Sequence, residues 1–88
     1  MDAKELQFEK VVKENKATIY SVCYMFSTDN DEVADLFQEV LINLWTGFDR
    51  FKGLSNARTW IYRVALNTCI SINRKMQKIE EQLSQLEE

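Results

Sequence analysis

The chain contains no proline and only two glycines among its 88 residues. Because these two residue types interrupt helices and strands most strongly, their scarcity favours long helices joined by few turns. Gly47 and Gly53 bracket one connection, and a run of turn-forming and capping residues at positions 27–31 marks a second. Two connections between long elements predict three helices.

The first two predicted helices are read from apolar residues that recur at steps of three and four. One spans Ala3–Phe26, with Asn15 interrupting its apolar stripe. The next is capped by Asp29 or Asp31 and carries acidic residues in its first turn, as the helix dipole favours. Its apolar stripe is uninterrupted and is the most regular pattern in the chain. That stripe comprises Val33, Leu36, Phe37, Val40, Leu41, Leu44, Trp45 and Phe48.

The third predicted helix begins near Ser55 or Asn56, either of which can cap it, and can extend past Met76. Its inward-facing residues are expected to be Ile61, Val64, Ala65, Thr68 and Ile72. Residues 77–88 are rich in glutamine and glutamate, so we expect a helical tail or the start of a linker there.

Burying these stripes against one another predicts an all-α fold, a small antiparallel three-helix bundle formed by residues 1–76. A chain of this length supports a single modest core, and we expect loss of Trp45 or Leu41 to unfold it. Cys23 and Cys69 lack metal-ligand spacing and are expected to be buried free thiols. Apolar runs fall far short of the roughly 20 residues that a membrane helix requires, so we expect a soluble cytoplasmic protein without membrane insertion.

Charge is unevenly distributed along the chain. Residues 1–49 carry a net charge of −6, residues 50–78 carry +7, and residues 79–88 carry −4, although the total is only −3. The aromatic residues among the basic ones are Phe51, Trp60 and Tyr62. Basic and aromatic side chains together are typical of surfaces that bind unpaired nucleic-acid bases. The segregation predicts two surfaces with two different partners.

Two groups of residues are left over once the core is filled. Opposite the stripe of the second predicted helix, the polar side chains by themselves fit a solvated helix face. Ile42 lies among them and weakens that interpretation, and a partner helix would explain it. On the third predicted helix, Trp60, Arg63 and Asn67 share one face. There an amide can hydrogen-bond a base edge while an aromatic ring stacks on the base. Phe51 lies in a glycine-flanked turn, where packing has little need of an aromatic ring.

Two separated blocks of sequence carry a family resemblance. Residues 35–40 (Asp-Leu-Phe-Gln-Glu-Val) and Trp45 form the first block, and residues 48–53 and 58–67 form the second. Their order, spacing and identities resemble region 2 of bacterial extracytoplasmic-function (ECF) sigma factors. The resemblance extends over roughly residues 8–75.

The resemblance implies a transcription initiation factor domain with no cofactor. Its implied partners are the RNA polymerase core, through the clamp helices of the β′ subunit, the non-template single strand of the −10 promoter element, and an anti-sigma factor. The implied polymerase-binding residues are Asp35, Gln38, Glu39, Ile42 and Asn43. The implied DNA-binding residues are Phe51, Lys52, Gly53, Ser55, Asn56, Arg58, Trp60, Arg63, Asn67, Arg74 and Lys75. Family members also carry a second, helix-turn-helix domain, so this chain is expected to be either an excised domain or a truncated form.

Two other classes of function remain as alternatives. The first is a helical protein-interaction module without DNA specificity. The second is an enzyme, for which the chain has no histidine, no glycine-rich phosphate loop and no nucleophile constellation. Asp35 and Glu39 lie one helical turn apart and could attract a metal ion, but no second pair of ligands accompanies them.

Overall fold

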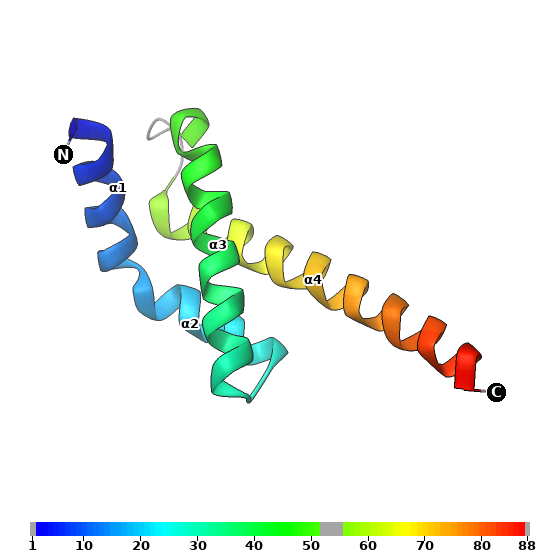
Figure 1. Cartoon of the computed structure of the whole chain (residues 1–88). Helices are drawn as coiled ribbons and strands as arrows, with labels where there is room; N and C mark the ends of the chain where they lie inside the picture. The colour runs from blue at the N-terminus through cyan, green and yellow to red at the C-terminus, as the bar shows by residue number, and fades with distance from the viewer. Residues whose placement is uncertain (1, 52–55, 88) are drawn as a thin grey trace.

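Helices account for all the regular structure of the described chain. The computed structural model describes residues 2–51 and 56–87, and it contains four helices within them (Figure 1). They are α1 (Ala3–Glu14), α2 (Lys16–Phe26), α3 (Asn30–Phe51) and α4 (Ala57–Glu87). The predicted all-α class is therefore confirmed, whereas the predicted number of helices, three, is replaced by four.

The additional helix arises because the first predicted helix breaks at Asn15. The side-chain amide of Asn15 donates to the carbonyl oxygen of Val11 at 2.8 Å, and its backbone N–H donates instead to Val12 at 3.1 Å. In a continuous helix that backbone N–H would bond the carbonyl of Val11. The side chain thus competes with the backbone for one acceptor and ends α1, as asparagine often does.

Side-chain caps set the starts of the two long helices. The carboxylate of Asp29 accepts hydrogen bonds from the backbone N–H groups of Asp31 (2.8 Å) and Glu32 (3.1 Å). Asn56 accepts in the same way from Arg58 (2.9 Å) and Thr59 (3.4 Å). These bonds satisfy backbone donors that have no partner inside a first helical turn. Of the predicted alternatives, Asp29 is the cap of α3 and Asn56 caps α4.

The core lies between α2, α3 and α4. Its buried hydrophobic residues are Ile19, Val22, Cys23, Val33, Leu36, Val40, Leu44, Ile61, Ala65 and Cys69. Thr68 is also buried, while Val64 and Ile72 pack at the edge of the core, so the inward face predicted for the third helix is confirmed. No residue of α1 is fully buried. The three later helices therefore form the core, and α1 packs onto its outside.

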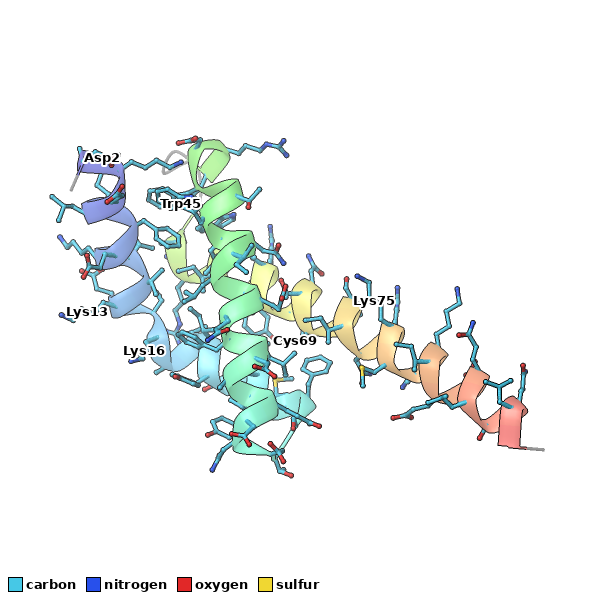
Figure 2. The ribbon with its side chains drawn as sticks, in the orientation of Figure 1. Asp2, Lys13, Lys16, Trp45, Cys69 and Lys75 are labelled. Carbon is cyan, nitrogen blue, oxygen red and sulfur yellow. The ribbon has the colours of Figure 1, made fainter. Side chains whose placement is uncertain are left out.

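Trp45 is a contact residue between helices rather than a core residue. Its side chain is 38% exposed and lies between α3 and α1 (Figure 2). The ring meets Phe8 of α1 edge-on, with centroids 5.0 Å apart, and the ammonium of Lys4 lies 4.1 Å from the ring centroid. The burial predicted for Trp45 is wrong because its position on the stripe faces α1, which covers only part of the ring.

The second half of α4 extends away from the other helices, and the longest dimension of the molecule is 55 Å (Figure 1). Residues 76–87 are helical, and the large apolar side chains along this segment are exposed. They continue the spacing of the buried face, and comprise Met76, Ile79, Leu83 and Leu86. None of the described helices is both long and apolar enough to cross a membrane.

Candidate functional site

The exposed face of α3 is acidic with one apolar side chain at its centre. Asp35, Gln38 and Glu39 are exposed, and Ile42 is 57% exposed although it is a branched aliphatic residue. All four lie on the side of α3 opposite the buried residues, because successive residues of a helix are offset by about 100°. The structure therefore brings four of the five predicted polymerase-binding residues together on one face.

Asn43, the fifth of these residues, contacts α4. Its side-chain amide donates to the hydroxyl oxygen of Thr68 at 2.8 Å. Thr68 is only 6% exposed, and its hydroxyl donates in turn to the carbonyl of Val64 at 2.7 Å. One amide N–H of Asn43, a residue expected to face the polymerase, is thus used within the fold, although the residue is exposed.

A second face runs along α4. Trp60, Arg63, Asn67 and Arg74 follow one another at steps of three, four and seven residues, which places them in one line on the helix. Arg63, Asn67 and Arg74 are exposed, and Trp60 is half-buried. A row of this composition offers an aromatic edge, an amide and two guanidinium groups to a ligand. We call these four residues the α4 row.

Lys78 belongs to the same line, four residues after Arg74, and is exposed. Lys78 belongs to the basic segment 50–78 but is not among the DNA-binding residues predicted from the sequence. Continuing the same helical step beyond Arg74 would have identified it. From Trp60 to Lys78 this line covers 18 helical steps of 1.5 Å, or about 27 Å.

Phe51 is the last residue of α3 and stacks on Trp60. The ring centroids are 4.6 Å apart and the planes differ by 16°. Phe48 lies against both rings at 6.2–6.4 Å. The expectation that Phe51 serves no packing role in a turn is therefore wrong, because it joins the end of α3 to the start of α4. Trp60 therefore belongs both to this aromatic stack and to the α4 row.

The remaining predicted DNA-binding residues are not part of that row. Arg58 lies elsewhere on α4 and lines a groove against α2 of about 430 Å³, together with Met25 and Tyr62. Lys75 is exposed on the extended part of α4 (Figure 2). It directly follows Arg74 and is therefore turned by about 100° from the row. The side-chain oxygen of Asn56 serves as the cap of α4. Lys52, Gly53 and Ser55 lie outside the described residues.

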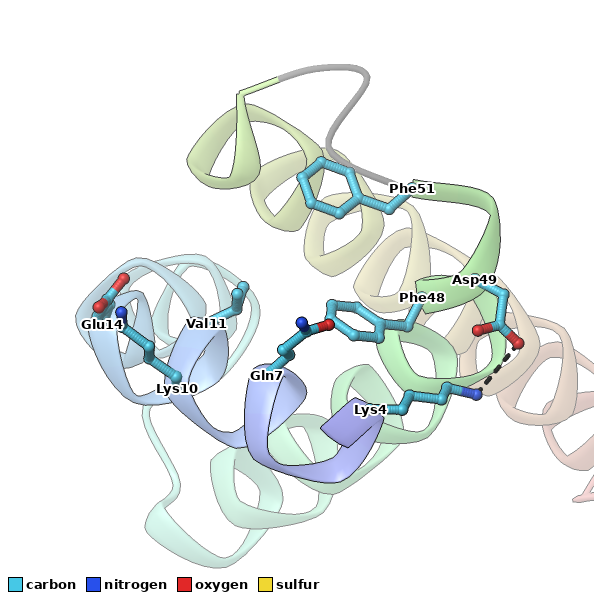
Figure 3. Close-up of a pocket in the computed structure, with 8 residues that line it drawn as sticks. All are labelled: Lys4, Gln7, Lys10, Val11, Glu14, Phe48, Asp49 and Phe51. Carbon is cyan, nitrogen blue, oxygen red and sulfur yellow. Dashed lines mark hydrogen bonds and ion pairs between the residues drawn. The ribbon is translucent and has the colours of Figure 1, made fainter. Parts of the chain in front are cut away.

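A shallow groove of about 590 Å³ lies between α1 and the end of α3 (Figure 3). Phe48 and Phe51 line one side of it, with Gln7 of α1 facing Phe48. At its edge, Lys4 forms an ion pair with Asp49 at 3.2 Å. No site residue was predicted in this part of α1. Phe8 of α1 meets Phe48 edge-on, with ring centroids 5.2 Å apart, and so attaches α1 to the same aromatic stack that borders the α4 row.

The two cysteines are buried free thiols, as predicted. Burial raises the pKa of the Cys23 thiol to about 12, and the neighbouring Cys69 thiol adds to that rise. Burial likewise raises the pKa of Cys69. Both side chains are therefore protonated and unreactive near neutral pH. Within the described residues, no three His, Cys, Asp or Glu side chains are grouped so that they could hold a metal ion.

Comparison with known proteins identifies the family. The sequence model described as Sigma-70 region 2 matches residues 11–79, which include the exposed face of α3, the aromatic stack and the α4 row. The chain belongs to the sigma-70 region 2 family. The resemblance to ECF sigma factors is confirmed by individual relatives. No solved structure matches the chain.

Two of these relatives illustrate the extent of the similarity. The ECF RNA polymerase sigma factor SigG of Mycobacterium tuberculosis is 30% identical over 70 residues, which cover 80% of this chain and 19% of that protein. The ECF RNA polymerase sigma factor SigW of Bacillus subtilis is 34% identical over 68 residues, which cover 77% of this chain and 36% of that protein. This sigma region 2 chain therefore spans only about a third of the length of SigW and about a fifth of the length of SigG.

Proposed function

We propose that this chain acts in transcription initiation, binding RNA polymerase core through α3 and the −10 promoter element through α4. The observation that carries the proposal is the Sigma-70 region 2 match over residues 11–79. The structure adds support, because polar residues that the core does not use gather on two separate helix faces. One face is acidic with an apolar centre, and the other is basic and aromatic. Such faces suit a protein partner and a nucleic-acid partner respectively.

The exposed face of α3 is proposed to dock on the clamp helices of the polymerase β′ subunit. Asp35 and Glu39 offer negative charge, and Gln38 offers an amide. Ile42 would enter an apolar depression between basic residues of the partner, which accounts for its 57% exposure. Complementary charge of this kind raises the rate of encounter and excludes partners of the wrong sign.

The α4 row is proposed to hold the separated non-template strand. Asn67 would read a base edge beside the Phe51–Trp60 stack, while Arg63 and Arg74 would hold phosphates. Unstacking a base costs a few kcal/mol, and stacking on an aromatic side chain can return about 1–3 kcal/mol per base. Binding energy of this size would assist strand opening without hydrolysis of a nucleotide. Further DNA contacts are proposed at Lys52, Gly53, Ser55, Asn56, Arg58 and Lys75.

Binding of labelled single strands tests this function. A fluorescent strand that carries a −10 sequence should bind better than a scrambled strand of equal composition, with the larger difference in the presence of polymerase core. Equal binding of both strands with and without polymerase would refute the promoter function. It would favour the alternative of a helical protein-interaction module if polymerase binding persisted.

Salt dependence of strand binding tests the extent of the α4 row. Each phosphate contacted contributes a slope of about −0.7 to a plot of log affinity against log salt for single strands. Lys78→Ala should therefore reduce the steepness of the slope by about 0.7. Lys13→Ala is the matched control, because Lys13 is an exposed lysine on α1. An equal change in both variants would mean that the two lysines act only through net charge.

A further inference from the structure

Among the described residues, a single side-chain hydrogen bond links α3 to α4, and its two residues adjoin the faces to which separate partners are assigned. Asn43 lies one turn after Glu39 on α3, and Thr68 directly follows Asn67 on α4. The bond between the two side chains is 2.8 Å long. The rest of the contact between these helices in the core is apolar. Apolar side chains tolerate small rotations and shifts of one helix against another, whereas a hydrogen bond is directional.

The direction of each bond in this link follows from the donors available. The single hydroxyl proton of Thr68 is used on the carbonyl of Val64 at 2.7 Å. Its oxygen must therefore accept from Asn43, which supplies an amide N–H. Because Thr68 is 6% exposed, water has little access to replace Asn43 as the donor. The side chain of Asn43 is thereby held in one orientation, with its amide nitrogen toward α4.

We infer that Asn43 and Thr68 are a positioning pair that fixes the rotation of α4, and hence the aim of Asn67, relative to the polymerase-binding face of α3. This inference rests on the proposed function and changes the role given to Asn43 within it. Neighbouring residues of a helix are offset by about 100°, so a rotation that moves Thr68 also moves Asn67. A side chain that reads a base edge must be held within a narrow range of positions, which packing alone leaves less well defined. Asn43 therefore acts on base selection through Thr68, without touching DNA.

The test measures base discrimination, defined as the ratio of affinities for strands that differ at one −10 base, in complexes of the full chain with polymerase core. Thr68→Val keeps the shape of the buried side chain and removes the hydroxyl. Asn43→Ala removes the donor. We expect either change to reduce discrimination roughly three- to tenfold, the range that one hydrogen bond of this kind supports. The double variant should lose no more than the single variants, because both remove the same bond.

Two controls separate positioning from general destabilisation. Thr68→Ser keeps the hydroxyl and should retain the discrimination of the unaltered chain. Thr46→Val removes a hydroxyl that donates to Ile42 of its own helix at 2.9 Å and makes no link to α4, so discrimination should stay unchanged. Affinity for polymerase core should be the same in Thr68→Val as in the unaltered chain.

Different results would overturn the positioning role of Asn43 and Thr68 and the proposed function on which it rests. If the unaltered chain prefers no base, the proposed function itself fails. If the unaltered chain discriminates and Thr68→Val discriminates equally well, the positioning role is overturned while the function stands. A loss of polymerase affinity in Asn43→Ala but not in Thr68→Val, with discrimination intact in both, would return Asn43 to the set of direct polymerase contacts.

Discussion

At the scale of single residues, asparagine shows how context decides the role of a side chain. Asn15 takes a backbone acceptor and ends α1. Asn56 accepts two backbone N–H groups and begins α4. Asn43 reaches across to Thr68, whereas Asn67 is exposed. One amide group therefore breaks a helix, caps a helix, links two helices or remains available to a ligand, according to the groups within its reach.

The two buried thiols predict a specific response to alkaline pH. Their raised pKa values mean that the folded state keeps both protons while the unfolded state loses them above a pKa near 9.0. Unfolding therefore becomes more favourable as pH rises. The contribution of the thiols to stability should be complete below about pH 9 and should decrease from there toward pH 12. Urea unfolding at pH 8, 9 and 10 in the presence of a reducing agent measures this decrease.

The control for this prediction is the double variant Cys23→Ala/Cys69→Ala. Tyrosine and lysine side chains also titrate in this range, so only the difference between the two proteins reports on the thiols. The variant should lose less stability than the unaltered chain between pH 8 and pH 10. Parallel pH curves for both proteins would contradict the raised pKa values.

At the scale of elements, α3 and α4 each present one face to the core and another to solvent. The faces follow from helical periodicity, because the apolar stripe of each helix is used in packing and the opposite side is left exposed. On α3 the exposed face is acidic, and on α4 the row from Trp60 to Arg74 is basic and aromatic. The two proposed partners are thereby assigned to different helices. A substitution on the exposed face of one helix should therefore affect only one of the two interactions.

Paired substitutions on the two helices test that separation. Asn67→Ala should change which −10 base is preferred and leave polymerase affinity intact, because Asn67 is exposed on α4. Gln38→Ala combined with Glu39→Ala should weaken polymerase binding and leave base preference unchanged. Strand binding and polymerase binding are measured for both variants. Equal loss of the same activity in both would contradict the two-surface arrangement.

At the scale of the whole molecule, a small core carries most of the stability. The core lies between α2, α3 and α4, and α1 is attached from outside through Phe8, Trp45 and the Lys4–Asp49 ion pair. That ion pair is exposed and contributes about 0–1 kcal/mol. The free energy of unfolding should therefore depend much more strongly on residues of the three-helix core than on the contacts of α1.

Substitutions along α3 check this division. Leu44 is fully buried, so Leu44→Ala should lower the free energy of unfolding by about 2–5 kcal/mol. Ile42→Ala, two residues away and exposed, is the matched control and should have little effect on stability. Trp45→Ala should cost less than Leu44→Ala, because part of the Trp45 ring already faces solvent. Thermal or chemical unfolding measures all three, and a greater loss for Trp45→Ala than for Leu44→Ala would contradict the arrangement.

The sequence by itself determined the helical class, the break before α3, the buried face of α4 and the composition of the two exposed faces. The connection after α3 was predicted to begin at Gly47, which is wrong because α3 continues through Gly47 to Phe51. These depend on local steps of three and four residues, on capping side chains and on the order of charges, all of which are present in the linear chain. Only the tertiary structure decided that Asn15 divides the first helix, that Phe51 stacks on Trp60, and that Asn43 bonds Thr68. The first depends on which of two donors reaches the carbonyl of Val11. The other two depend on how α3 and α4 lie against each other, which periodicity along either helix does not specify.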